Sequence, residues 1–177
     1  MKLVLPAEYP YAMMALAANF LQCQLFAPTF VLPARLAAFT KDHLAQYEGE
    51  HKAAFGENAK IDSVGNPDQG NGWYSRSLDF EQWCKMNQAQ RVLMNYIESF
   101  PYLIAFTLLS GIYFPIYACI GAWGILLGRF VYSVGYKIKP QARVFGALMM
   151  FACNLMMMIL SMCSVFMLLE GNSSTTA

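Results

Sequence analysis

Two runs of polar side chains interrupt apolar stretches at spacings that place each run on one face of a helix. Arg91, Asn95 and Glu98 follow one another at i, i+4 and i+7. A second run, at i, i+3 and i+7, consists of Arg129, Tyr132 and Tyr136. Guanidinium, amide and hydroxyl groups together suit an anionic ligand, because arginine can hold a carboxylate through two parallel hydrogen bonds.

The elements around these runs predict that the two faces meet. Pro115 marks a tight turn between two apolar stretches, so the helices on either side of it are antiparallel neighbours. The start of the helix before Pro115 and the end of the helix after it therefore lie at one membrane level. The last apolar stretch of the chain begins at that level with Arg143, and the first apolar stretch ends there with Arg35. The predicted cluster is Arg35, Arg91, Asn95, Glu98, Arg129, Tyr132, Tyr136 and Arg143. Charges at this depth are costly unless paired, so this surplus of cations favours an anionic ligand.

The same residues also allow purely structural interpretations. Arg91 and Glu98 could neutralise each other between helices. Arg143 could extend its charged end to the membrane surface, as Lys139 could. Tyr132 and Tyr136 could belong to an interfacial aromatic belt. Spacing alone leaves these alternatives open.

Composition assigns these helices to a membrane. The chain has 177 residues, of which 57% are hydrophobic and 13% charged, whereas soluble domains are about 25% charged. A membrane helix needs about 20 predominantly apolar residues. We therefore predict an all-α integral membrane protein in which residues 1–177 form a single four-helix bundle. The predicted spans are about 11–35, 80–112, 116–136 and 143–169.

Polar features refine this outline. Residues 40–78 are expected to form a polar loop insertion with a short amphipathic helix around Lys41–Phe55. Pro28 is expected to kink the first span, and Asp79 to cap the second, with Gln82 three residues on. The amides in the first span are expected to face other helices instead of lipid: Asn19, Gln22 and Gln24.

The placement of charged residues predicts how the protein is oriented in the membrane. The sequence also argues against nucleic-acid binding and against a metal site. The loops at 33–79 and 137–143 carry the basic residues, whereas the opposite side has only Lys2, so the basic loops should face the cytosol or an equivalent compartment. The chain has no basic tail for nucleic acid. No metal site is expected, because the two histidines lie in the polar loop and the five cysteines lie in or beside apolar segments without a CxxC motif.

Three motifs together resemble the MAPEG family, the membrane-associated proteins of eicosanoid and glutathione metabolism. Residues 91–101 fit RxxxNxxExxP, and residues 128–136 fit G/A-R-x-x-Y-x-x-G-Y. Residues 136–148 continue the pattern through Arg143. Within the family, the motifs look most like the third microsomal glutathione S-transferase type, and they also resemble the leukotriene-forming synthase.

The resemblance implies a homotrimer of four-helix bundles that binds glutathione as co-substrate between subunits near the cytosolic face. Arg143 would be the catalytic residue beside the thiol. Arg35 would reach a carboxylate from the neighbouring subunit. The remaining cofactor-binding residues would be Arg91, Asn95, Glu98, Arg129, Tyr132 and Tyr136.

The implied function is a glutathione transferase or peroxidase of the endoplasmic reticulum or a mitochondrial membrane. Its thiolate would attack a lipophilic electrophile or reduce a lipid hydroperoxide. The alternative is an accessory subunit of a larger membrane complex. The long polar loop favours that alternative, and so do Leu93 and Ser99, where the leukotriene-forming relative has polar or aromatic contacts.

Overall fold

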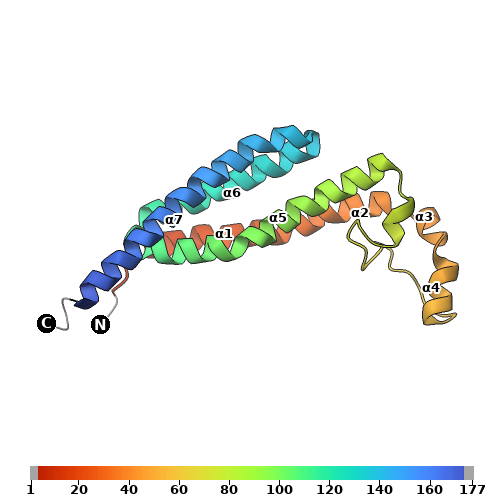
Figure 1. Cartoon of the computed structure of the whole chain (residues 1–177), viewed down its shortest axis with the longest axis horizontal. Coiled ribbons are helices and arrows are strands. Elements are labelled where there is room, and N and C mark those ends of the chain that lie inside the picture. The colour runs from red at the N-terminus through yellow and green to blue at the C-terminus, as the bar shows by residue number, and fades with distance from the viewer. Residues whose placement is uncertain (1–3, 174–177) are drawn as a thin grey trace. The chain divides into compact units, whose positions relative to one another are not determined.

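The computed structural model describes residues 4–173, and every regular element in that range is a helix (Figure 1). Lys2 lies outside the described residues. Four helices are long and apolar enough to cross a membrane, namely Tyr9–Ala38, Phe80–Gly111, Pro115–Ile138 and Pro140–Glu170. They confirm the four predicted spans and the all-α membrane class.

Proline interrupts the first span where the sequence predicts it. The α1 helix (Tyr9–Phe26) passes into the π-helical turn η1 (Ala27–Val31) and then into α2 (Leu32–Ala38). Pro28 has no backbone N–H and therefore cannot continue the regular α-helical hydrogen bonds. The wider π turn accommodates this loss, because it shifts the hydrogen-bond pattern by one residue.

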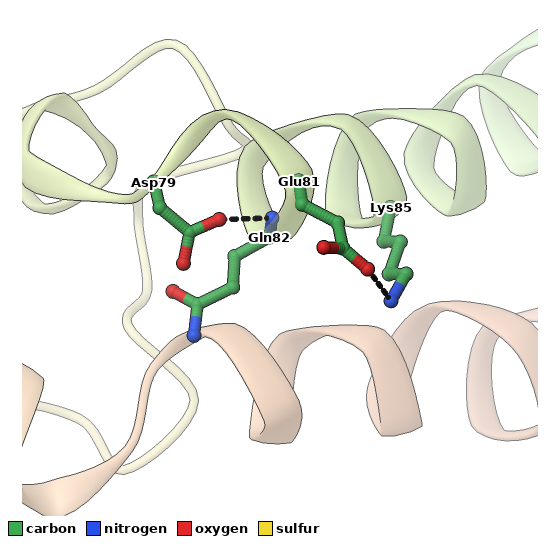
Figure 2. Close-up of polar contacts among 4 residues, drawn as sticks. All are labelled: Asp79, Glu81, Gln82 and Lys85. Carbon is green, nitrogen blue, oxygen red and sulfur yellow. Dashed lines mark hydrogen bonds and ion pairs between the residues drawn. The ribbon is translucent and has the colours of Figure 1, made fainter.

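The second span begins at a side-chain cap. Asp79 precedes α5 (Phe80–Gly111), and its Oδ1 accepts a hydrogen bond from the backbone N–H of Gln82 at 2.8 Å (Figure 2). One turn of the helix later, Lys85 Nζ lies 2.5 Å from Glu81 Oε1 (Figure 2). The cap confirms the predicted helix start, whereas the exposed ion pair contributes little.

The chain divides into two compact units, Met1–Cys23 with Asn95–Ala177, and Gln24–Met94. The first unit combines most of α1, the second half of α5, α6 (Pro115–Ile138), the 3-10 turn η3 (Pro140–Ala142) and α7 (Arg143–Ser173). Its core consists of Leu103, Ile125 and Met157, which are 2%, 1% and 0% exposed. Because these residues come from α5, α6 and α7, and Leu16 of α1 packs against them, this unit is the four-helix assembly.

Glycines bring α6 and α7 into close contact, so that the two helices run side by side in Figure 1. A Cβ atom on Gly146 would overlap the Tyr132 backbone nitrogen and lie 2.5 Å from the Gly128 carbonyl oxygen. A Cβ on Gly135 would lie 2.7 Å from the carbonyl oxygen of Ala142. Only glycine allows this approach, which sets the height and rotation of the α6 residues beside α7.

The amides of the first span follow the prediction in two cases of three. Asn19 is fully buried, and its Nδ2 donates to the carbonyl oxygens of Ala15 and Ala122, each at 2.9 Å. Gln22 Nε2 donates to the carbonyl oxygen of Leu126 at 3.1 Å. The side chain of Gln24 is exposed in the single chain, so its contact with another helix stays a prediction. Two residues beyond Gln22, it points about 200° away around the helix.

The second unit folds the polar loop around a small core. Phe39, Leu44, Tyr74 and Met86 are buried together. The single amphipathic helix predicted at 41–55 is instead two short helices, α3 (Lys41–Ala45) and α4 (Glu48–Phe55), and η2 (Tyr74–Ser77) follows later. The break places the ring of Tyr47 against Tyr74, with centroids 5.3 Å apart in an edge-to-face arrangement. Tertiary packing therefore overrides the helical continuity of this segment.

A buried carboxylate organises the 65–75 segment. Asp68 is 4% exposed, and its Oδ1 accepts from the backbone N–H groups of Gly70 and Gly72 at 2.7 and 2.9 Å. The backbone N–H of Ser75 donates to Oδ2 at 2.7 Å. Burial alone would raise the pKa of Asp68, but these hydrogen bonds outweigh it and lower the pKa below its usual value. The segment is therefore held together by an ionised side chain.

Candidate functional site

The four-helix unit contains a cavity of about 590 Å³. Its polar end is lined by Asn95, Glu98 and Ser99 of α5 and by Arg129 and Tyr132 of α6. The residues that α7 contributes are apolar, Met150 among them, except for Asn154. Ligand cavities commonly have this volume and this mixture of a few polar groups with apolar walls. The shape and chemistry suit an amphipathic ligand.

Two of the predicted ligand-binding residues are directly bonded. Asn95 Nδ2 donates to the Tyr132 hydroxyl oxygen at 2.7 Å. The ring of Tyr132 stacks on that of Tyr136, with centroids 5.7 Å apart and planes inclined by 25°. The guanidinium carbon of Arg143 lies 4.7 Å from the centre of the Tyr136 ring. A continuous chain of contacts therefore joins Asn95 to Arg143 across α5, α6 and the start of α7.

Arg129 is the buried cation of the cavity. It is 5% exposed, and its Nη2 donates a short hydrogen bond to Ser99 Oγ. Its guanidinium carbon lies 4.8 Å from the centre of the Tyr96 ring. Within residues 4–173, no group accepts a hydrogen bond from its Nε. A buried cation with an unused donor can interact favourably with an anionic or hydrogen-bond-accepting group in the cavity.

Tyr96 supports Arg129 from the other side. Tyr96 is fully buried, and its hydroxyl donates to the Asn19 backbone oxygen at 2.7 Å. This bond ties α5 to α1, so the ring beneath Arg129 is held by two helices. A cation over an aromatic face gains electrostatic attraction that increases when water is excluded. The position of Arg129 on α6 therefore depends on contacts with α5 and, through Tyr96, on α1.

The other predicted residues are placed differently. Glu98 lines the cavity and is exposed. Arg143, the first residue of α7, is also exposed, but it is not among the residues that line the cavity. Arg35 belongs to the second unit, where it is 6% exposed. Its Nε donates to the Val64 carbonyl oxygen at 2.9 Å, so it stabilises the polar loop. Arg91 is an exposed residue of α5 and also belongs to the second unit.

Sequence reasoning assigned no role to two further residues that the cavity uses. Ser99, noted only as a departure from a relative, accepts the hydrogen bond of Arg129. Its position four residues after Asn95, on the same helical face, is the signal that pointed there. Asn154 of α7 lines the cavity as well, and within the described part of the chain its Oδ1 has no hydrogen-bond donor. An apolar stretch as long as α7 gave no spacing pattern that would single it out.

Comparison with known proteins agrees with the motifs. The model of the MAPEG family matches residues 20–163, well over half of the chain. This range contains α5, α6 and all the residues of the cavity. No curated protein and no solved structure matches the chain.

Proposed function

Because the chain belongs to the MAPEG family, we propose that it is a membrane-bound glutathione transferase or peroxidase whose site is the cavity between α5, α6 and α7. The observation that carries this proposal is the buried guanidinium of Arg129 beside the bonded pair Asn95 and Tyr132. Glutathione has two carboxylates and an ammonium group, and these side chains with Glu98 offer partners for both signs of charge.

Arg143 is the proposed activator of the thiol. A free thiol has a pKa near 8.5, so only a minority is ionised at neutral pH. A nearby cation and a helix N-terminus both lower that value. Arg143 combines them, because it is the first residue of α7 and its guanidinium rests on the ring of Tyr136. Its role is electrostatic: it stabilises the thiolate and does not itself accept the proton.

The apolar wall supports a lipophilic second substrate. Met150, Phe151, Leu155 and Met158 of α7 line the cavity beside its polar end. An acyl chain could lie along them while its electrophilic or hydroperoxide group approaches the thiolate. The thiolate sulfur would then form a bond to the electrophilic carbon, while the displaced electron pair departs with a leaving group or moves into the conjugated system and takes up a proton. In the peroxidase reaction the thiolate would instead attack a peroxide oxygen and break the O–O bond, which releases the lipid as an alcohol after protonation and leaves glutathione as a sulfenic acid. A second glutathione thiol would then attack the sulfenic sulfur, forming the disulfide and releasing water.

A homotrimer in the endoplasmic reticulum or a mitochondrial membrane, with the site on the cytosolic or equivalent side, completes this proposal. The exposed faces of the spans are rich in large apolar residues, such as Phe20, Leu127 and Phe151. Such faces need lipid or another subunit as a neighbour. We propose that Arg35 reaches a carboxylate of the glutathione bound by a neighbouring subunit, and that Arg91 also contacts glutathione.

The test is calorimetric titration of the purified protein with glutathione, followed by conjugation and peroxidase assays. Asn95→Leu should weaken glutathione binding by about tenfold or more, since it removes a polar contact and unpairs Tyr132. Trp123→Leu, on the exposed surface of α6, is the matched control. If millimolar glutathione gives no detectable heat with the unchanged protein, the proposed function is wrong.

A second function is an accessory subunit of a larger membrane complex. It is favoured by the polar unit, which is the second compact unit, Gln24–Met94, with its folded loop. This unit has its own core and a buried carboxylate, although nothing in glutathione chemistry requires it. Purification in mild detergent distinguishes the two functions. A stoichiometric assembly with other proteins and no turnover supports the accessory role, whereas an active homotrimer contradicts it.

A further inference from the structure

A second cavity, of about 450 Å³, lies wholly within the polar unit. Aromatic rings dominate its lining: Tyr47, Phe55, Trp73 and Tyr74. Two carboxylates, Glu50 and Asp68, and the imidazole of His51 also line it, whereas none of its described lining residues is lysine or arginine. An aromatic cavity with acidic groups and no lining cation attracts cationic organic groups.

Hydrogen bonds hold the rings in place. Trp73 Nε1 donates to Glu50 Oε2 at 2.6 Å. The hydroxyl of Tyr47 lies 2.6 Å from Ser77 Oγ, and that of Tyr74 lies 3.1 Å from His51 Nδ1. The polar edges of the three rings are therefore occupied by protein groups. A ligand gains affinity when the groups that receive it are already fixed in this way.

The cavity favours an organic cation over a metal ion. Both oxygens of Asp68 already accept hydrogen bonds from protein donors, and Arg35 offsets part of its charge. In residues 4–173, no three His, Cys, Asp or Glu side chains come together as metal ligands. The exposed Glu50 is the carboxylate that an entering cation would meet. A quaternary ammonium group suits such a place, because it needs aromatic faces and no hydrogen-bond acceptor.

A free guanidinium beside the cavity extends the recognition. The guanidinium carbon of Arg76 lies 4.1 Å from the centre of the Trp73 ring. Arg76 is exposed, and its guanidinium makes no hydrogen bond or ion pair within the described residues. Its N–H groups are available to a phosphate, for which a guanidinium has the matching geometry. A cation in the aromatic cavity and a phosphate at Arg76 would together make up a phosphocholine group.

We propose that this cavity binds phosphocholine, with the trimethylammonium group among Tyr47, Phe55, Trp73 and Tyr74 and the phosphate at Arg76. The proposal is independent of glutathione and of the cavity in the four-helix unit. Phosphocholine has two sources, a soluble metabolite and the headgroup of a membrane lipid. The polar unit leads at both ends into spans, at Ala38 and Phe80. Trp73 can lie no more than roughly 25 Å along the chain from Phe80, the first residue of a span, which keeps membrane headgroups within reach of the cavity.

The experiment is calorimetry on the full chain in a maltoside detergent, which carries no cationic headgroup. Phosphocholine, dihexanoyl phosphatidylcholine and dihexanoyl phosphatidylglycerol are titrated separately below their micellar concentrations. We expect saturable binding of one or both choline compounds and none of the glycerol lipid. Binding of free phosphocholine identifies a soluble ligand, and binding of the diacyl form alone identifies a lipid headgroup. Equal binding of phosphatidylglycerol, or no binding at millimolar concentration, overturns the proposal.

Variants test the cavity itself. Trp73→Leu should weaken binding roughly 5- to 30-fold through the loss of one cation–aromatic contact. Trp123→Leu, the same change on α6 outside this unit, should leave it unchanged. Phe55→Leu keeps the test valid if Trp73→Leu fails to fold, because Phe55 is 75% exposed. Arg76→Gln should weaken phosphocholine binding but not choline binding. If affinity is the same in the Trp73, Phe55 and Arg76 variants as in the original protein, the proposal is wrong.

Discussion

Asn95 of α5 and Tyr132 of α6 are joined by a hydrogen bond of 2.7 Å at the polar end of the cavity. The residues lie 37 positions apart, and each belongs to a different motif. Tyr132 stacks on Tyr136, which in turn lies beneath Arg143. The two polar faces that were inferred from spacing therefore meet through side-chain contacts in the four-helix unit.

Tyr132→Phe should test the structural value of this contact. The change leaves the amide of Asn95 without its acceptor in a partly buried place, which should lower the free energy of unfolding by about 1–2 kcal/mol. Tyr136→Phe is the matched control, since its hydroxyl makes no hydrogen bond within residues 4–173, and its effect should be below about 0.5 kcal/mol. Thermal unfolding in detergent measures both. Equal losses would show that the bond contributes nothing specific.

Ser99→Ala should destabilise the protein through Arg129. The substitution removes the acceptor of a charged, buried donor, and such losses are roughly 1.5–3 kcal/mol. Ser110→Ala is the control in the same helix, because Ser110 is also buried, but within the described residues its hydroxyl donates to the Phe106 carbonyl of its own helix alone. Chemical unfolding curves of the two variants should differ clearly. Coincident unfolding curves would show that the hydrogen bond from Arg129 to Ser99 does not stabilise the protein.

The outline of the fold and part of the site were predictable from local patterns. Apolar runs and prolines limit the spans, because lipid requires about 20 apolar residues and proline ends a helix. Helical spacing placed Asn95 and Glu98 on one face, and that face does line the cavity. These features depend on a few neighbouring residues, which is the information that a single sequence contains.

The remaining features depend on how helices are rotated against each other. Spacing places Ser99 on the helical face of Asn95, but its bond to Arg129, 30 residues later, depends on how α6 is rotated against α5. Arg35 lies in the last turn of the first span, which ends at Ala38, and its partner is the carbonyl of Val64 in the loop. The break between α3 and α4 arises from the packing of Tyr47 on Tyr74. Such long-range contacts have no signature in spacing.

Gly146→Ala should disrupt the contact between α6 and α7. The added methyl group would meet backbone atoms of Tyr132 and Gly128, which cannot move as a flexible side chain can. We expect a loss of about 3 kcal/mol in the free energy of unfolding, near the upper end for overpacking. Gly49→Ala in α4, where nothing lies within 4 Å of the new atom, should be neutral or slightly stabilising. Comparable stability of the two variants would contradict the close approach.

Acid should open the polar unit through Asp68. Its pKa in the folded protein lies below the ordinary value of 3.8, so its stabilising effect is present above that value. The effect is lost as the pH falls below about 4 and through the folded pKa. Trp83 reports the change, because its Nε1 donates to the Gly70 carbonyl oxygen at 2.9 Å, in the loop that Asp68 holds. We expect its fluorescence to shift between pH 5 and pH 2.

Asp68→Asn should remove most of that acid transition, because the side chain can no longer change its charge. It should also destabilise the unit at pH 7, by about 1–3 kcal/mol, since one oxygen acceptor becomes an N–H donor facing the N–H of Ser75. Glu57→Gln, an exposed acid of the same unit, should retain the transition. An unchanged acid transition in Asp68→Asn would place its origin elsewhere.

Arg143 should control the ionisation of bound glutathione. If its charge stabilises the thiolate, the pH–rate profile of the unchanged protein should give an apparent thiol pKa about one unit or more below 8.5, and Arg143→Ala should return it toward 8.5. One unit corresponds to about tenfold in thiolate at neutral pH. Arg143→Lys keeps the charge and should retain part of the effect, although it loses the planar contact with the Tyr136 ring. Ultraviolet absorbance of the bound thiolate, titrated without the second substrate, provides a readout that is independent of turnover. A common thiol pKa in all three proteins, with glutathione still bound, would assign Arg143 to binding alone.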